Sequence, residues 1–185
     1  MFKPDQKKLP LQRGLVAVLS VLLIFLQGAA ISRTIQTQSK WGEIKQGIGV
    51  GEIVIGESTA DDVVARHGSN YELKSQNEYS YRMEYSNPEA AFYYCFKDPK
   101  KKIFLVEVHD GVIKGGIVIG KSTMKDVVAI YGERVGGVNN SISEYPGIQF
   151  YFEAPGEAGD EAAAMNRKVI EVDIVAPDKS SNFCD

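Results

Sequence analysis

Apolar and polar residues follow three different patterns along this chain. Residues 14–31 form an apolar run interrupted only by Ser20 and Gln27, and four basic residues precede it. Two later stretches, beginning at Ile53 and Ile117, combine an apolar Ile-Val-Ile-Gly segment with valines at helical spacing. The segments after each stretch alternate between apolar and polar residues, as strands do. The pattern predicts a membrane-directed segment followed by a domain that mixes helices and strands.

The two Ile-Val-Ile-Gly stretches are copies of each other. Residues 53–68 and 117–132 are identical at 11 of 16 positions without a gap, and equivalent residues lie 64 positions apart. Such self-similarity predicts an internal duplication. We therefore expect two tandem units, residues 50–113 and 114–178, followed by a short tail of residues 179–185.

Each copy carries the signals for one short helix. In the first copy, Ser58 and Thr59 offer hydroxyl groups that cap a helix N-terminus. Asp61 and Asp62 follow in the first turn, where the helix dipole favours carboxylates. Gly68 is expected to end the helix in a left-handed conformation. The second copy repeats these signals at the equivalent positions.

Three alternating or apolar runs follow each helix and predict an antiparallel meander. The runs cover residues 79–85, 91–96 and 103–109 in the first unit and residues 141–145, 148–152 and 169–175 in the second. The predicted fold class is therefore α+β: two tandem repeats, each a short helix packed on a three-stranded antiparallel meander, after an N-terminal apolar helix. The two sheets are expected to lie side by side or to form one continuous layer.

The first 31 residues are expected to address the cytoplasmic membrane. The basic region, residues 1–13, keeps the N-terminus inside, and the run of residues 14–31 reaches the lower length limit of a spanning helix. This favours a single-pass anchor with an extracytoplasmic C-terminal domain. Cleavage near Ala30 is the alternative, and it would give a secreted or periplasmic protein. Residues 32–49 resemble a polar tether, with Trp41 on the first sheet or near the lipid interface.

Only two cysteines are present, Cys95 in an apolar run and Cys184 near the C-terminus. In an oxidising compartment they could pair and fasten the tail to the fold. The alternative is a buried Cys95 and an unpaired Cys184. Two distant cysteines and two histidines do not have the spacing of a zinc site. No metal or cofactor is therefore expected.

No catalytic constellation is visible in the sequence. His67 occupies the position that Tyr131 fills in the other copy, so a packing role is expected for it. His109 precedes Asp-Gly and is expected to be an exposed strand-end residue. Neighbouring Asp61 and Asp62 point to different sides of a helix and make a poor acid/base pair. The net charge of −3 gives no basic excess that would favour nucleic acid. We expect a protein that is not an enzyme and does not bind nucleic acid.

Tyrosines on the predicted strands are the best candidates for a binding surface, because large aromatic side chains are enriched at interfaces. Tyr93 and Tyr151 are expected to stay exposed and to form the recognition patch. Lys100, Lys101 and Lys102 lie in a loop of the first repeat, and the equivalent loop of the second repeat, residues 153–167, is acidic. The two loops either form complementary rims of a binding surface or are simply solvated. The expected function is protein binding in the cell envelope, with an unknown envelope protein as partner. The alternative is a small-ligand sensor or envelope enzyme that uses a cleft between the repeats.

The repeated pattern also carries a family resemblance. Apolar-x-Ile-Gly-x-Ser/Thr-x-x-Asp-Val-Val-x-x-aromatic/His-Gly, followed by three strands, resembles the BamE-like (SmpA/OmlA) extracytoplasmic modules over most of residues 50–176. In tandem it is similar to the β-lactamase inhibitor protein fold. The chain departs from the family in having no cysteine after the apolar run and in carrying Ser69 and Glu133 where a proline is common. The resemblance implies a scaffold that recognises other proteins with its sheet face and has no catalytic residues.

Overall fold

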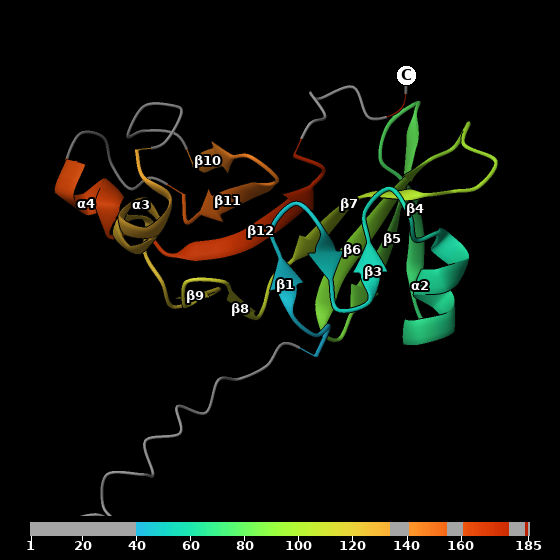
Figure 1. The fold of residues 1–185 in the computed structure, drawn as a ribbon, viewed down its shortest axis with the longest axis horizontal. Helices are drawn as coiled ribbons and strands as arrows, with labels where there is room; N and C mark the ends of the chain where they lie inside the picture. The colour runs from blue at the N-terminus through green and yellow to red at the C-terminus, as the bar shows by residue number, and fades with distance from the viewer. Residues whose placement is uncertain (1–39, 134–140, 155–160, 178–183, 185) are drawn as a thin grey trace, which may run out of the picture. The chain divides into compact units, whose positions relative to one another are not determined.

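The computed structural model describes residues 40–133, 141–154, 161–177 and 184 (Figure 1). All described residues belong to one compact unit, residues 37–185. The expected apolar helix of residues 14–31 thus lies outside the described residues. In the part that is described, no helix has both the length and the apolar character needed to cross a membrane. The described part is an α+β structure built mostly of β-sheet, which confirms the α+β class.

A seven-stranded antiparallel sheet forms the larger layer, in the order β10-β11-β12-β7-β6-β5-β4 (Figure 1). Its strands are β4 (Glu72–Ser75), β5 (Ser80–Ser86), β6 (Glu89–Cys95), β7 (Ile103–Val108), β10 (Ile142–Tyr145), β11 (Ile148–Phe152) and β12 (Val169–Val175). All six predicted strands are present. Because β12 pairs with β7, they form one continuous layer. The edge strand β4 escaped prediction because its residues are mostly polar and exposed.

Five two-residue strands form a second, smaller sheet in the order β3-β2-β1-β8-β9. They are β1 (Ile44–Lys45), β2 (Gly49–Val50), β3 (Ile53–Val54), β8 (Val112–Ile113) and β9 (Ile117–Val118). β1 runs parallel to β8, with Ile44 beside Ile113. The repeated Ile-Val segments, expected as apolar lead-ins to the helices, are therefore strands of this sheet.

The expected tether is part of the folded unit from Trp41 onward. The Trp41 side chain is 5% exposed, and its ring centroid lies 4.5 Å from that of His67 and 5.3 Å from that of Tyr85. Ile44 on β1 is buried as well. The few apolar residues of this polar stretch gave too weak a periodicity to reveal this. Trp41 thus packs over the larger sheet, the first of the two places expected for it.

Three helices are described: α2 (Ala60–His67), α3 (Met124–Tyr131) and α4 (Glu161–Met165). Thr59 caps α2: its backbone N and Oγ1 donate to Asp62 Oδ2 at 2.8 and 2.9 Å. Thr123 donates to Asp126 Oδ2 in the same way at the start of α3, at 2.7 and 2.9 Å. These bonds lower the pKa of both aspartates. The predicted N-caps are confirmed, since each carboxylate satisfies donors at a helix start.

Both predicted helix ends are also present. Gly68 and Gly132 follow α2 and α3 with φ of +84° and +86°, a region that favours glycine. Tyr85 donates its hydroxyl to the Gly68 carbonyl at 2.8 Å, and Tyr145 donates to the Gly132 carbonyl at 3.1 Å. Each helix end is thereby fastened to a strand of the larger sheet.

The last residues of the two helices pack against the larger sheet. The His67 ring stacks on Phe92 at 5.9 Å between centroids, and the Tyr131 ring lies 5.0 Å from Phe150. Burial lowers the pKa of His67, with a smaller contribution from Arg66. The packing role expected for His67 is confirmed.

A single apolar core lies between the larger sheet on one side and the helices and small sheet on the other. Phe92 of β6 and Val106 of β7 are fully buried in it, as are Val63 of α2 and Val127 of α3. Because strand side chains alternate between the two faces, every second residue of these strands points away from the core. The opposite face of the sheet is therefore formed by the remaining strand residues.

Candidate functional site

The face of the larger sheet that points away from the core is polar. Tyr93 and Glu107 alternate with the core residues Phe92, Val106 and Val108 along β6 and β7. We call this surface the polar face and define it by its side chains: Arg82, Glu84, Tyr93, Glu107, His109, Gln149, Tyr151, Glu171 and Asp173. It draws on five neighbouring strands and on residues that are far apart in the sequence.

Two buried carboxyl groups lie directly opposite each other at the centre of the polar face. Glu107 on β7 pairs with Asp173 on β12, and the two residues are 7% and 6% exposed. Like charges at facing positions destabilise a sheet, and burial raises the cost of each charge. The pKa of each carboxyl group therefore depends on the hydrogen-bond donors and charges around it.

Glu107 has several donors. It accepts hydrogen bonds from Arg82 Nη2, from the Tyr93 hydroxyl and, at 2.9 Å, from His109 Nε2. Burial raises the pKa of Glu107, but the bonds from His109 and Tyr93 and the nearby guanidinium outweigh it and leave that pKa below its usual value. Arg82 also binds Glu84 at 2.8 Å. Glu107 is thus held as a carboxylate in a network of donors.

Asp173 has one donor where Glu107 has three. Its Oδ2 accepts a hydrogen bond from the Tyr151 hydroxyl at 3.0 Å. Its Oδ1 is buried and has no hydrogen-bond partner within the described part of the chain. Burial, together with the charge of Glu171, raises the pKa of Asp173 to about 7. Burial and the charge of Glu107 raise the pKa of Glu171 as well.

His109 lies among three carboxyl groups. Its Nε2 is 2.9 Å from Glu107 Oε1, 3.6 Å from Glu171 Oε2 and 3.7 Å from Glu89 Oε1. The bond with Glu107 raises the pKa of His109 above its usual value. The expectation of an exposed strand-end histidine is wrong, because the ring is half-buried between β6 and β12. Pairing between distant strands brings the acids to it, and the local Asp-Gly sequence gave no sign of this.

A hollow of about 360 Å³ opens on the polar face. It is lined by Gln76, Asn77, Ser80, Tyr93, Phe104, Leu105, Glu107, Tyr151, Glu171 and Asp173. A second hollow of about 500 Å³ is lined by His109 and Glu89 among others. Since Glu107 and Glu171 line the first hollow and their neighbour His109 lines the second, this cluster lies between the two.

The two candidate tyrosines, Tyr93 and Tyr151, both line the first hollow, but they are less exposed than expected. Tyr93 is 8% exposed, so the expectation that it stays on the surface is wrong. Its hydroxyl group satisfies Glu107, and its ring lies 5.8 Å from the Arg82 guanidinium carbon. Tyr151 is half-buried and donates to Asp173. Both tyrosines therefore act first as partners of buried carboxyl groups.

The candidate lysines lie elsewhere. Lys100, Lys101 and Lys102 are exposed in the loop between β6 and β7, and none of them lines the hollow that contains Tyr93. The loop folds around Asp98, whose carboxylate accepts from the backbone N of Lys100 and of Lys102, both at 2.9 Å. The Lys101 carbonyl accepts from the Ala60 N at 3.0 Å, at the start of α2. The loop thus supports the helix. The acidic loop of the second half falls partly outside the described residues.

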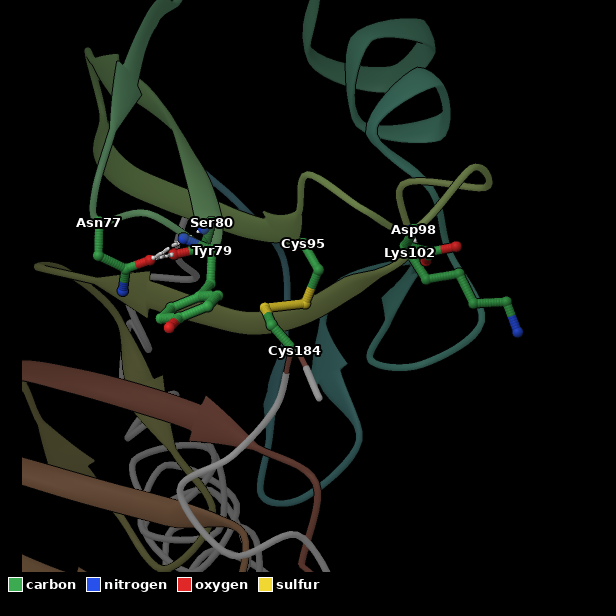
Figure 2. Close-up of a disulfide and its surroundings, with 7 residues drawn as sticks. All are labelled: Asn77, Tyr79, Ser80, Cys95, Asp98, Lys102 and Cys184. Carbon is green, nitrogen blue, oxygen red and sulfur yellow. Dashed lines mark hydrogen bonds between the residues drawn. A yellow bond between two sulfur atoms is a disulfide. The ribbon is translucent and has the colours of Figure 1, made fainter.

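The two cysteines are joined in a disulfide, which settles the alternative in favour of pairing (Figure 2). Cys95 ends β6, two residues after Tyr93, so it lies on the side of the sheet that carries the polar face. Figure 2 shows the disulfide between Asn77, Tyr79 and Ser80 on one side and Asp98 and Lys102 on the other. Asn77 and Ser80 line the hollow. The bond therefore fixes Cys184 near the end of the polar face.

Comparisons with known proteins give a likeness among solved structures. No protein-family model matches the chain, and no curated protein matches it. Among solved structures, the chain is similar to the uncharacterized protein YfeY from Escherichia coli, with 17% sequence identity and a TM-score of 0.42. The match covers 70% of this chain and 97% of that chain.

Proposed function

We propose that this protein is an extracytoplasmic binding protein of the cell envelope whose polar face receives a basic side chain of a partner protein. The observation that carries the proposal is the hollow on the polar face, which is lined by two tyrosines and by three acids, Glu107, Glu171 and Asp173. The cations that face these acids are Arg82 and His109. A lysine or arginine of a partner would add the positive charge that this surface lacks.

The aromatic lining suits the same ligand. Cations bind over the faces of aromatic rings, and Arg82 already lies in this way beside Tyr93. Tyr151 offers a second ring beside Asp173 Oδ2. A guanidinium or ammonium group in the hollow would lie over a ring and form a charge-assisted hydrogen bond with a carboxylate, and both contacts favour a cation. We infer a binding role rather than an enzymatic one.

The disulfide supports the proposed location, because disulfides persist in oxidising compartments outside the cytoplasm. In this proposal, residues 14–31 anchor the protein in the cytoplasmic membrane with its N-terminus inside. Release of a periplasmic or secreted form by cleavage near Ala30 is the alternative. Either form would present the polar face outside the cytoplasm.

The proposal includes a duplicated module. Matching backbone hydrogen bonds support it: Ile103 N donates to the Ser58 carbonyl at 2.8 Å, and Val169 N donates to the Ser122 carbonyl at 2.9 Å. We propose that residues 50–113 and 114–178 arose from one ancestral unit, related to the BamE-like modules. Recognition through the sheet face, which that resemblance implies, agrees with a site on the polar face.

A small cationic molecule is the second candidate ligand. It is favoured by one observation, that Tyr93 and Glu107 of the first half and Tyr151 and Asp173 of the second line a single hollow. Free amines and polyamines share the chemistry of a lysine side chain. They would fill the hollow without needing the surrounding sheet surface.

The test uses the full chain, purified in mild detergent with its disulfide intact. Its binding to an immobilised array of random peptides should favour sequences rich in lysine and arginine, and the enrichment should weaken as salt is raised. Glu171→Gln and Tyr151→Phe should each reduce the enrichment severalfold. Glu57→Gln, an exposed acid in the turn between β3 and α2 that does not line the hollow, is the matched control and should leave it unchanged.

Two outcomes would count against a protein partner. Equal binding of acidic and basic peptides, or enrichment that survives both polar-face variants, would contradict it. Spermidine binding with no peptide enrichment would favour the small-ligand candidate instead.

A further inference from the structure

We propose that Glu107, His109 and Glu171 form a binding site for one divalent transition-metal ion, with zinc as the ion that fits best. The site goes beyond the proposed partner binding and does not depend on it. The three residues come from β7, the residue after its end, and β12, and they offer two carboxylate oxygens and one imidazole nitrogen. This donor set matches what zinc accepts in proteins.

The geometry of the three ligand atoms supports the site. All three lie within 4.8 Å of one another, with 2.9 Å between His109 Nε2 and Glu107 Oε1 and 3.6 Å between His109 Nε2 and Glu171 Oε2. Bonds of about 2.0–2.2 Å in a tetrahedron place zinc ligands about 3.3 Å apart. The two distances from His109 Nε2 differ from this value by a few tenths of an ångström, and the separation of the two carboxylate oxygens differs by at most about 1.5 Å, so modest side-chain rotations would seat an ion between these atoms. The proton on His109 Nε2 would leave to solvent as the ion binds.

A buried acceptor beside the cluster is an independent indication that a cation belongs here. Asp173 lies opposite Glu107 in the strand pairing, is 6% exposed and lines the same hollow as Glu107 and Glu171. Its Oδ1 has no hydrogen-bond partner within the described part of the chain. Buried polar atoms are rarely left unpaired, and such an atom calls for a specific explanation. A metal-bound water could donate to this oxygen.

The residues around Glu107 resemble the supporting shell that metal ligands need. Tyr93 donates to Glu107 Oε2, and Arg82 holds the same carboxylate from β5. Hydrogen bonds of this kind orient a ligating carboxylate and keep it ionised. Arg82 has a second partner in Glu84 at 2.8 Å, so it can stay paired when an ion approaches Glu107.

The cluster is open to solvent and has a candidate fourth ligand. It lies between the two hollows, and His109 lines the larger one. Glu89, which is 59% exposed at its side chain, has Oε1 3.7 Å from His109 Nε2. Its side chain is free to turn toward the ion. An imidazole among the ligands favours zinc over calcium or magnesium, which prefer oxygen atoms alone.

Zinc titration of the metal-free full chain, in detergent and without a histidine tag, tests the site. Calorimetry should show one Zn²⁺ per chain, and zinc should raise the unfolding temperature. His109→Asn and Glu171→Gln should each weaken zinc affinity about tenfold or more. The matched controls are His67→Tyr, which installs the residue found at position 131, and Glu57→Gln, and both should bind zinc as the parent chain does. X-ray absorption should report one nitrogen and at least two oxygen neighbours at about 2.0–2.2 Å.

Several outcomes would overturn the proposal. These are no zinc binding at 100 µM free ion (roughly −5.5 kcal/mol), binding unaffected by Glu171→Gln, or Ca²⁺ binding as tightly as Zn²⁺. Glu171 is half-buried and has no role in the core, so its variant is expected to fold even if His109→Asn does not. Peptide binding by the zinc-free chain is measured separately, so failure of the metal site and failure of partner binding are distinguishable.

Discussion

The polar face contains two tyrosine–carboxyl pairs that share a geometry and differ in charge. Tyr93 donates to Glu107 in the first half, and Tyr151 donates to Asp173 in the second. Each acid lies two residues beyond the tyrosine's cross-strand partner, which is Leu105 for Tyr93 and Glu171 for Tyr151. The two pairs occupy matching positions, and their acids face each other across the junction of β7 and β12.

The surroundings of the two pairs explain the difference. Arg82 lies opposite Tyr93, whereas Ile142 lies opposite Tyr151. Two residues beyond Glu107 is His109, and two residues beyond Asp173 is Val175. The second pair thus lacks both cations of the first, and the pKa of Asp173 rises while that of Glu107 falls. With nearly the same backbone and the same hydroxyl donor, the pKa values of the two acids shift in opposite directions because the neighbouring side chains differ.

Of the changes that separate the two pairs, removal of Glu107 should cause the largest loss in the free energy of unfolding. Glu107→Ala leaves Arg82 without its main partner and His109 without its acceptor, and a broken buried ion pair costs on the order of 3 kcal/mol. The same truncation of Asp173 should cost much less, because no buried cation depends on it. Urea unfolding at pH 7 with a chelator present measures both. Equal losses would show that the two carboxyl groups play the same role.

The disulfide joins the strand that carries Tyr93 to the tail, and the strand that carries Tyr151 has no such bond in the described part of the chain. Cys95 lies two residues after Tyr93, while Glu153 stands two residues after Tyr151. Cys184→Ser should lower the free energy of unfolding by about 2–4 kcal/mol, since a bond that joins residues 89 positions apart restricts the unfolded chain. Urea unfolding with and without reductant checks this. Reductant should lower the stability of the parent chain and leave that of Cys184→Ser unchanged.

The two tyrosine hydroxyl groups should contribute different amounts to the free energy of unfolding at acidic pH. At pH 5 Glu107 is ionised, so Tyr93→Phe should cost about 1.5–3 kcal/mol, as for a hydrogen bond to a charged group. Asp173 is protonated at that pH, and Tyr151→Phe should cost about 0.5–1.5 kcal/mol. Above pH 8 the two losses should converge. Thermal unfolding at both pH values tests this, and a gap that does not narrow would contradict the assignment.

The smallest effect is expected from neutralising Asp173. The folded chain binds this proton more tightly than the unfolded chain, so stability falls as pH rises from 3.8 to about 7. His109, whose pKa is also raised, acts in the same direction. Asp173→Asn keeps an acceptor for Tyr151 and should raise stability at pH 8 by about 1 kcal/mol, with little change at pH 4. An unchanged slope of stability against pH would contradict the raised pKa.

Most of the fold followed from local signals in the sequence. The caps at Thr59 and Thr123, the glycines that end the helices and the alternation in six strands all depend on residues close to one another in the chain. The small sheet and β4 were missed because their strands are only two residues long or mostly polar. The continuous layer depends on the pairing of β7 with β12, which no local pattern specifies.

The candidate site was missed for a related reason. Tyr93 and Tyr151 were recognised as important, but their partners were not, since Glu107 meets Asp173 only through that distant pairing. One local signal was present. Glu107-Val-His109 and Glu171-Val-Asp173 place charged or polar residues at every second position of strands otherwise rich in valine and isoleucine, and acids are depleted from strands.

The disulfide between Cys95 and Cys184 determines where a label attached near Cys184 would lie. Because Cys184 is held at the margin of the polar face, a fluorophore or affinity handle attached next to Cys184 starts beside the hollow. A bulky group there would compete with any ligand for that surface, whereas a small dye would report the binding of the ligand. The size of the group attached near Cys184 therefore decides whether the binding surface is blocked or monitored.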